Sequence, residues 1–478
     1  MKNYEYKLLI NGEWVSGEKK LEVRNPYNQE LLGTVPEANE QQVDNAIKSA
    51  QESFKLTKTL PAYQRSLILE RTSDIIKERK EELAHIITLE SGKPIKLAKG
   101  EVDRATETFK FASEEAKRLY GETIPMDASA KGENRVGFTF REPLGVIGAI
   151  SPFNFPLNLV AHKVAPAIAS GNTVVLKPAT YTPITSIKLG EIMLSAGVPQ
   201  GTLNIITGPG STVGDAIVRD ARISKITFTG SASVGLGITE KAGLKRITLE
   251  LGSNSPVIID ENAPQNAGQK IVERCVFGSF AYAGQVCISI QRIYVHQDIK
   301  DEFLKQFLKA VSELKSGDPL DEDTDIGPMI TEGDANRVKQ WVDEAVSQGA
   351  KVLIGGKHKG PMFEPTVLTD VTPEMKVVAQ EIFAPVVSIM GFNDWEQVIK
   401  EANNSKYGLQ AGVYTNDVKK AFYAAKNLEA GGIIINDIPT YRVDHIPYGG
   451  VKKSGIGREG VRYAIEEMTQ PKFVCFNL

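Results

Sequence analysis

Between residues 146 and 249, five short segments rich in apolar residues alternate with segments of helical periodicity. The apolar segments are Val146–Ile150, Thr173–Leu176, Leu203–Ile206, Lys225–Thr229 and Arg246–Leu249, and the helical ones are Thr185–Ala196, Thr212–Asp220 and Val234–Ala242. Strands that alternate with helices form βαβ units, which build a mostly parallel sheet buried on both faces. Ligands of such sheets bind at the carboxyl ends of the strands, so functional residues are expected in the segments that follow them.

The same alternation resumes after residue 255 and predicts a second α/β domain, with the boundary near the loop Gly252–Pro256. Helices are expected at Gln269–Phe280 and Asp301–Leu314, and strands at Gln291–His296, Lys351–Ile354, Val386–Phe392 and Gly432–Asn436. Ahead of both domains, residues 41–120 have helical periodicity, and Gly92-Lys93-Pro94 supplies a stop signal within them.

Two further segments read as strands without an evident partner. Residues 131–142 (KGENRVGFTFRE) resemble an isolated hairpin, and residues 471–478 (PKFVCFNL) are strand-like at the far end of the chain. Their isolation favours edge pairing with another subunit, hence a homo-oligomer, either a dimer or a tetramer. The alternative is a peripheral strand of the chain's own sheet.

Charge and composition exclude several classes of function. Lys plus Arg number 56 and Asp plus Glu 59, a net charge of −3, so no basic surface for nucleic acid or an anionic membrane is expected. Three cysteines at unrelated spacings rule out a disulfide framework and favour a reducing compartment. Five scattered histidines without a metal-ligand motif predict no protein-bound metal. Without an apolar signal segment or a run of about 18 apolar residues, the chain is expected to be cytoplasmic.

Cys287 is the candidate nucleophile among the three cysteines. It follows a helical segment and lies among small and flexible residues, in Tyr282-Ala283-Gly284-Gln285-Val286-Cys287. Cys275 lies on an apolar helix face, where an inert packing role is typical, and Cys475 near the terminus is expected to pack as well.

Two polar residues at strand ends could assist such a nucleophile. Glu250 ends an apolar strand, where a buried carboxylate implies either a reaction or a salt bridge, and a raised pKa there would suit a general base. Asn154 lies between two prolines in Ser151-Pro152-Phe153-Asn154-Phe155-Pro156, a rigid setting for a preorganised oxyanion donor. A capping asparagine in a turn is the alternative for Asn154.

Three strand-end turns could present backbone N–H groups or a lysine to a phosphate. They follow Leu176, Ile206 and Phe228. The second turn has the spacing GxGxxxG and not GxGxxG, so the ordinary dinucleotide fingerprint is absent.

Taken in order, the blocks SPFNFP, VVLKPAT, FTGS, LELG, GQVC, EIFAPV and YGGVKKSGIGREG resemble the signature blocks of the aldehyde dehydrogenase superfamily over essentially the whole chain. The resemblance implies an α/β fold with two doubly wound parallel-sheet domains and a small β-flap for oligomerisation. The implied cofactor domain spans 1–122 and 144–253, the catalytic domain 254–446, and the flap 123–143 and 467–478.

The resemblance also implies the chemistry. Cys287 would attack the aldehyde carbon, Asn154 and the Cys287 backbone N–H would hold the oxyanion, and hydride would pass to NAD or NADP. Glu250 would then activate water to hydrolyse the thioester on Cys287. The implied cofactor-binding residues are Ile150, Ser151, Pro152, Phe153, Lys177, Ala179, Thr180, Gly210, Gly214, Phe228, Thr229, Gly230, Ser231, Leu251, Gly252, Glu381 and Phe383. Thr180 stands where strict NAD users often carry an acidic residue, so NADP is compatible.

For the substrate, Arg104 and Arg442 are similar in position to the phosphate-binding residues of non-phosphorylating glyceraldehyde-3-phosphate dehydrogenases. Phe155 and Val286 replace other polar contacts of that branch, which favours a smaller anion or a polar hydroxyaldehyde. The expected substrates are 3-sulfolactaldehyde, lactaldehyde, glyceraldehyde 3-phosphate and succinate semialdehyde. The substrate-binding set is Arg104, Phe155, His162, Arg442 and His445, with His162 near a 2-hydroxyl. In the alternative, Arg442 only pairs with Asp444 or a neighbouring carboxylate.

Other functions remain open at this stage. A CoA-acylating enzyme would use the same fold, but such members generally lack the hydrolytic base that Glu250 resembles. A non-catalytic relative is disfavoured by the joint presence of Cys287, Glu250 and Asn154. A cysteine hydrolase would need a histidine base, and no histidine lies in a motif near Cys287.

Overall fold

The computed structural model describes residues 4–264 and 268–478. Helices dominate its N-terminal part, as the periodicity of residues 41–120 predicts. They are α1 (Glu40–Thr57), α2 (Ala62–Glu78), α3 (Lys80–Ser91) and α4 (Ile95–Glu115). The predicted stop is confirmed, because Gly92 caps α3 in the left-handed region (φ 71°) and Pro94 is the N-cap residue of α4.

The first sheet has eight strands in the order β24-β12-β11-β8-β9-β10-β2-β3. Its five central strands confirm the predicted parallel core: β8 (Val146–Ile150), β9 (Thr173–Lys177), β10 (Leu203–Ile205), β11 (Ile223–Thr229) and β12 (Arg246–Glu250). Its helices are α5 (Asn158–Ala169), α6 (Ile184–Ser195), α7 (Asp215–Arg219) and α8 (Ala232–Lys241). The helix expected at 212–220 is divided, because a π-helical turn at Gly210–Gly214 precedes α7.

The edges of this sheet come from distant parts of the chain that the sequence analysis did not assign to it. β2 (Leu8–Ile10) and β3 (Glu13–Val15) extend one edge antiparallel, and β24 (Gly455–Ile456) covers the other. A separate small sheet joins β1 (Tyr4–Glu5), β4 (Lys20–Arg24) and β5 (Leu31–Pro36). The pairings of β2 with β10 and of β24 with β12 join segments far apart in sequence, so no local pattern predicts them.

The second sheet confirms the second α/β domain and has the order β15-β18-β19-β14-β13-β21-β22. The predicted strands are β14 (Arg292–His296), β15 (Lys351–Ile354), β19 (Val386–Phe392) and β22 (Gly432–Ile435). The sequence analysis missed β13 (Pro256–Ile259), β18 (Thr366–Thr369) and β21 (Gln410–Tyr414). The associated helices are α9 (Gly268–Phe280), α10 (Gln297–Ser312), α11 (Glu332–Ser347), α12 (Lys376–Ala379), α13 (Trp395–Asn403) and α14 (Val418–Asn427). Of the strands described in this sheet, only β15 runs antiparallel to its neighbour.

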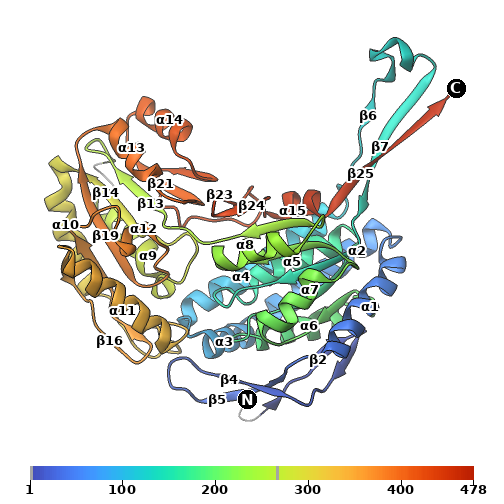
Figure 1. The fold of residues 1–478 in the computed structure, drawn as a ribbon, viewed down its shortest axis with the longest axis horizontal. Coiled ribbons are helices and arrows are strands. Elements are labelled where there is room, and N and C mark those ends of the chain that lie inside the picture. Colours follow the sequence, from blue (N-terminus) through green and yellow to red (C-terminus); the bar gives the residue numbers. More distant parts are fainter. Residues whose placement is uncertain (1–3, 265–267) are drawn as a thin grey trace.

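The two strands that lacked a partner in the sequence pair with each other. β25 (Thr469–Asn477) lies antiparallel to β7 (Arg135–Pro143) along its whole length, and β6 (Thr123–Ile124) pairs with the other side of β7. The expectation of an isolated hairpin at 131–142 was therefore wrong: most of that segment is one strand of a three-stranded arm. The pairing partners lie more than 300 residues apart, beyond the reach of a local pattern. Figure 1 shows the arm projecting from the body, with the C-terminus at its tip.

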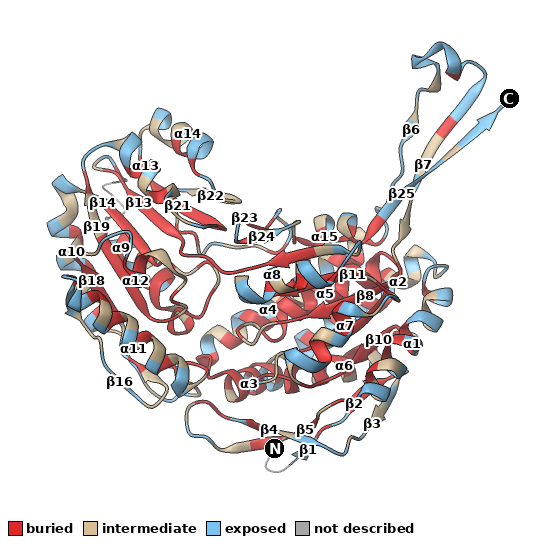
Figure 2. Cartoon of the chain, in the orientation of Figure 1, coloured by how far each residue is buried: buried red, intermediate tan, exposed pale blue. Residues whose placement is uncertain are grey.

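Burial follows this architecture. Figure 2 shows both sheets buried, the outer helix faces exposed and much of the arm exposed. α15 (Val461–Glu467) connects β24 to the arm and packs on α5. Among the described residues, no helix is both long enough and apolar enough to cross a membrane.

Candidate active site

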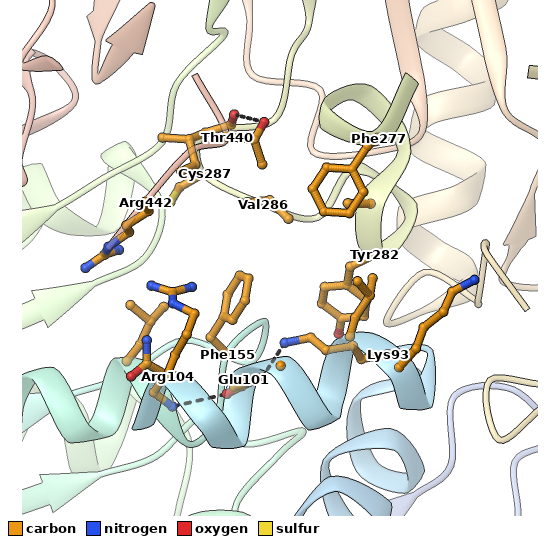
Figure 3. A pocket seen from close by; sticks show the side chains of 17 residues that line it. Lys93, Glu101, Arg104, Phe155, Phe277, Tyr282, Val286, Cys287, Thr440 and Arg442 are labelled. Carbon is orange, nitrogen blue, oxygen red and sulfur yellow. Dashed lines mark hydrogen bonds and ion pairs between the residues drawn. The ribbon is translucent and has the colours of Figure 1, made fainter. Parts of the chain in front are cut away.

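A cavity of about 260 Å³ opens beside Cys287. One wall comes from α4 and the loop after β8, and the other from α9, the Cys287 loop and residues 440–442 (Figure 3). Arg104, Phe155, Cys287 and Arg442, all proposed from the sequence, line it together. The cavity therefore gathers predicted residues from segments up to 338 positions apart in the chain.

The loop that carries Cys287 is backbone-strained and firmly held. Tyr282 (φ 50°), Ala283 (φ 51°) and Gly284 (φ 68°) are consecutive left-handed residues, and each such non-glycine residue costs roughly 1 kcal/mol or more. A Cβ on Gly284 would lie 2.0 Å from the Ala384 carbonyl oxygen. The buried Tyr282 hydroxyl donates to the Ser91 carbonyl at 2.6 Å. The fold thus fixes the turn that brings Cys287 to the cavity wall.

Asn154 reaches this loop from the first domain. Its side chain is buried, and Nδ2 donates to the Gln285 backbone carbonyl at 2.9 Å. Gln285 is itself held through its side chain, which donates to the Pro328 carbonyl and accepts from the Ile330 N–H. The amide of Asn154 therefore lies beside the turn that precedes Cys287, in a rigid setting.

Glu250 is the last residue of β12 and is buried. Neither of its carboxylate oxygens has a hydrogen-bond partner among the described residues. Burial and the charge of Glu459 raise the pKa of Glu250 well above its usual value, while Arg442 and Lys163 oppose that shift. The Glu250 charge in turn raises the pKa of the Cys287 thiol, so the two groups are electrostatic neighbours. A carboxylate with free oxygens and a raised pKa suits a general base.

Arg104 and Arg442 lie at the same end of the cavity (Figure 3). Arg104 donates two hydrogen bonds to Asp444, from Nη2 to Oδ1 at 2.7 Å and from Nε to Oδ2 at 3.1 Å. Arg442 Nη2 lies 3.3 Å from Glu459 Oε2, and Arg442 Nε lies 4.0 Å from Asp444 Oδ1. The carboxylate pairing considered as the alternative for Arg442 is therefore present, and both guanidinium groups still border the cavity.

The structure does not bring the two proposed histidines to the cavity. His162 is fully buried, and its Nε2 lies 2.7 Å from Asp444 Oδ1, so the imidazole contacts this carboxylate. Burial lowers the pKa of His162. His445 is exposed, and its ring packs against Phe111 at 5.1 Å between centroids.

A second cavity, of about 420 Å³, lies beside the first sheet, between the π-helical turn and α8. Four residues expected to bind the cofactor line it, namely Ile150, Gly210, Gly214 and Phe228. A Cβ added at Gly210 would meet no atom within 4 Å, so open space adjoins the backbone there. Ser231 caps the N-terminus of α8. An open cavity at the carboxyl ends of β8 and β11, with a helix N-terminus beside it, fits a dinucleotide.

The strand-end turn after β9 supplies a lysine and no acidic residue. Lys177 is buried, donates from Nζ to the Pro178 carbonyl at 2.9 Å, and has its pKa lowered to about 8 by burial. Its side chain lies within 3.5 Å of a Cβ built on Gly214, at the edge of the second cavity. Ala179 and Thr180 are half-buried, and Thr180 Oγ1 donates to the Gly208 carbonyl at 3.3 Å.

Other residues of the expected cofactor set cluster between the two domains. The Ser253 N–H donates to Glu381 Oε1 at 3.0 Å, and burial raises the pKa of Glu381 to about 7. Phe383, with φ 50°, meets Phe153 edge-to-face at 6.0 Å. The rest of the set lies on or directly after β8, β11 and β12: Ser151, Pro152, Thr229, Gly230, Leu251 and Gly252. Among residues 4–264 and 268–478, no group of three His, Cys, Asp or Glu side chains is placed to hold a metal ion.

Sequence reasoning missed three residues that surround the reactive groups. Tyr448 Oη lies 3.1 Å from Cys287 Sγ, and Lys163 Nζ forms a buried ion pair with Glu459 at 2.8 Å. Tyr448 and Glu459 belong to the block YGGVKKSGIGREG. The sequence therefore showed that they lie in a signature block, but it could not show which residues they contact.

Comparisons with known proteins agree with this geometry. The model of the aldehyde dehydrogenase family matches residues 14–474. The chain is 46% identical to a 3-sulfolactaldehyde dehydrogenase from Priestia aryabhattai, covering 99% of this chain and 98% of that one. Among solved structures, aldehyde dehydrogenase 21 from Physcomitrella patens, in complex with the reaction product succinate, superimposes with a TM-score of 0.97 at 43% identity, covering 100% and 99% of the two chains. A glyceraldehyde-3-phosphate dehydrogenase from Methanocaldococcus jannaschii, complexed with NADP, has a TM-score of 0.92 at 44% identity, covering 96% and 100%.

Fold, site and relatives thus lead to one conclusion. Two parallel-sheet domains meet at a cysteine whose pKa is raised by a buried carboxylate, and an asparagine amide donates to the turn that precedes this cysteine. This chain belongs to the aldehyde dehydrogenase family.

Proposed function

We propose that the protein oxidises a small aldehyde with a terminal anion to the carboxylic acid, using NAD(P)⁺. The aldehyde is a three-carbon 2-hydroxyaldehyde, with 3-sulfolactaldehyde as the first candidate. The observation that carries the proposal is the pair of guanidinium groups, Arg104 and Arg442, on the wall of the same 260 Å³ cavity as Cys287. Guanidinium groups bind sulfonate, carboxylate or phosphate oxygens through charge-assisted hydrogen bonds.

The charge of the cavity wall supports an anionic substrate. Two lysines also contribute to the lining, and a single carboxylate, Glu101, does so. Apolar side chains such as Phe155, Val286 and Phe277 form the remaining wall. A short carbon chain therefore has an apolar passage towards Cys287 and a cationic end for its anion. The similar 3-sulfolactaldehyde dehydrogenase and the succinate-bound relative act on or hold molecules with such an anion.

The reaction begins when the Cys287 sulfur, as thiolate, bonds to the aldehyde carbon. The carbonyl oxygen becomes an oxyanion, towards which Asn154 Nδ2 and the Cys287 backbone N–H donate. Bound NAD(P)⁺ would accept the hydride that leaves this carbon as the oxyanion re-forms its C=O bond, which leaves a thioester on Cys287. Glu250 then takes a proton from water, the hydroxide oxygen bonds to the thioester carbon, and the carbon–sulfur bond breaks to release the acid.

The chain's own residues fit the dinucleotide on both sides of the reaction centre. Gly210, Gly214 and Phe228 would hold it along the second cavity, Lys177 and Glu381 would bind its riboses, and Phe383 would pack near the nicotinamide. Thr180 leaves room for a 2′-phosphate without like-charge repulsion, and the glyceraldehyde-3-phosphate dehydrogenase cited above holds NADP. Both cofactors are therefore expected to support turnover.

A steady-state comparison tests the substrate. The kcat/KM for 3-sulfolactaldehyde is measured against that for lactaldehyde, which has the same carbon chain without the anion, with NAD and with NADP. The variant Arg104→Met is expected to lower kcat/KM for the anionic aldehyde by about 10- to 100-fold, the value of a hydrogen bond to a charged group, and to spare lactaldehyde. Lys99→Met is the matched control, since Lys99 lies on the same helix and pairs with Glu322 outside the cavity. Equal kcat/KM for the two aldehydes would refute the anionic substrate.

We also infer that the arm mediates homo-oligomerisation. Its strands carry exposed apolar side chains, including Val136, Phe140, Phe473 and Phe476. Exposed apolar surface on a projecting sheet is typical of a subunit contact. Light scattering of the purified protein measures the mass directly, and a monomer at micromolar concentration would contradict this inference.

A further inference from the structure

Tyr448 lies against the reactive sulfur in a role that the reaction described above does not use. The residue belongs to the loop between β22 and β23 (Val451–Lys452), and its side chain is buried. Its Oη lies 3.1 Å from Cys287 Sγ. Its backbone is fixed by an antiparallel bridge to Glu459, in which each residue's N–H donates to the other's carbonyl. The hydroxyl is therefore held at hydrogen-bond distance from the nucleophile.

A buried cation covers the ring of Tyr448. The Arg442 guanidinium carbon lies 3.7 Å from the ring centroid, and the Arg442 side chain is 6% exposed. Glu459 holds this guanidinium at 3.3 Å and also pairs with Lys163 at 2.8 Å. Glu459, Arg442, Tyr448 and Cys287 thus form a continuous series of contacts from a buried ion pair to the sulfur.

We propose that Tyr448 is a catalytic hydrogen-bond donor to the Cys287 thiolate, and that Arg442 is a positioning residue that fixes and polarises this donor through its ring. The inference rests on the proposed use of Cys287 as nucleophile. The thiol proton passes to water, giving thiolate and hydronium, and the phenol keeps its own proton. A hydrogen bond from a neutral donor to an ionised acceptor is about twice as strong as a neutral one, so it favours the thiolate over the thiol.

The other surroundings of Cys287 oppose the thiolate. Burial is the largest effect on the thiol and raises its pKa, and the charges of Glu250 and Glu381 raise it further. The Tyr448 hydroxyl and the Arg442 charge act in the opposite direction. Burial also keeps the pKa of Tyr448 well above its usual value, so the phenol stays protonated and remains a donor. Among the described residues, these four groups have the largest effects on the pKa of the thiol.

Alkylation of Cys287 by iodoacetamide, as a function of pH and without aldehyde or cofactor, tests this proposal. The rate follows the thiolate fraction, and mass spectrometry of the Cys287 peptide separates it from the exposed Cys475. Tyr448→Phe retains the ring beneath Arg442 and removes the hydroxyl. We expect the pH midpoint of alkylation to rise by about one unit and the rate at pH 7 to fall by about tenfold.

Tyr294→Phe is the matched control. Tyr294 is also buried in the catalytic domain, and its hydroxyl accepts a hydrogen bond from Arg292 at 3.4 Å and lies outside the contacts of Cys287. The midpoint of this variant is expected to equal that of the wild type. An unchanged midpoint in folded Tyr448→Phe would overturn the proposal.

Arg442→Met is a second variant that keeps the hydroxyl and removes the stacked cation. It is expected to raise the midpoint, and Tyr448→Phe is expected to add less in this background than alone, because coupled residues are non-additive. Full additivity would overturn the positioning role, and an unchanged midpoint in Arg442→Met would overturn it even if Tyr448→Phe failed to fold. The alkylation assay uses no aldehyde, so its outcome is independent of aldehyde oxidation. If the enzyme oxidises aldehydes and the substitutions leave the alkylation midpoint unchanged, this inference alone is refuted. If the midpoint shifts as expected and the enzyme oxidises no aldehyde, the proposed function alone is refuted.

Discussion

Replacing Glu250 with glutamine should separate the two halves of the reaction. The substitution keeps the size of the side chain and removes the proton acceptor. Cys287, Asn154 and the cavity that contains Cys287 are unchanged, so attack on the aldehyde and the first reduction of NAD(P)⁺ should still occur. The thioester on Cys287 should then persist, because no base activates water beside it.

The structure sets the expected size and pH dependence of this effect. A positioned general base contributes about 10²–10⁴-fold, and both Glu250 oxygens are buried without a hydrogen-bond partner in the described chain, so no other group shares the role by direct contact. Burial and Glu459 raise the pKa of Glu250. The ionised, basic form therefore accumulates only as pH rises through that raised value, and wild-type hydrolysis should accelerate with pH and then level off.

Stopped-flow absorbance measures both halves in one trace. It follows the reduced nicotinamide at about 340 nm, a wavelength set by the cofactor alone. Glu250→Gln should give a burst of one reduced cofactor per active site, followed by a steady rate lowered by about 100-fold or more. Mass spectrometry should find the acyl group on Cys287. A trace without a burst would refute the reasoning, because it would mean that Glu250 is also needed to form the thiolate.

Three further outcomes follow from individual contacts. Asn154→Ala should lower kcat by about 10²–10³-fold through loss of an oxyanion donor, measured as the single-turnover rate at saturating aldehyde. Gly252→Ala would place a Cβ 1.9 Å from Glu381 Oε2 and should weaken NAD(P) binding in a fluorescence titration. The control is Gly268→Ala, whose Cβ would meet no atom within 4 Å, and it should leave NAD(P) binding unchanged. Thr180→Glu should lower kcat/KM with NADP by about tenfold or more relative to NAD, a difference of about 1.4 kcal/mol, because the added carboxylate repels a 2′-phosphate; an unchanged cofactor ratio would contradict this placement.

The parallel cores of both sheets could be predicted because buried parallel strands are short, nearly continuous apolar runs. Segment 146–150 matches β8 at both ends, and segment 386–392 matches β19. Two of the strands that were missed make sheet contacts distant in sequence: β2 meets β10, and β21 meets β13. The same limit explains the arm, whose strand β25 looked isolated because its partner β7 lies more than 300 residues earlier.

The sequence by itself determined the fold class and the family, and it supplied the candidate reactive residues, because strand periodicity and short motifs are local properties. Only the tertiary structure decided which side chains share a cavity. Asp444 pairs with His162 and Arg104. The hydroxyl of Tyr448 lies at hydrogen-bond distance from the sulfur of Cys287, 161 residues earlier in the chain. Such contacts depend on how two sheets and a distant loop pack together, and the free energy of packing is distributed over the whole chain. The sequence names the groups, and the packing of the domains sets their distances and pKa values.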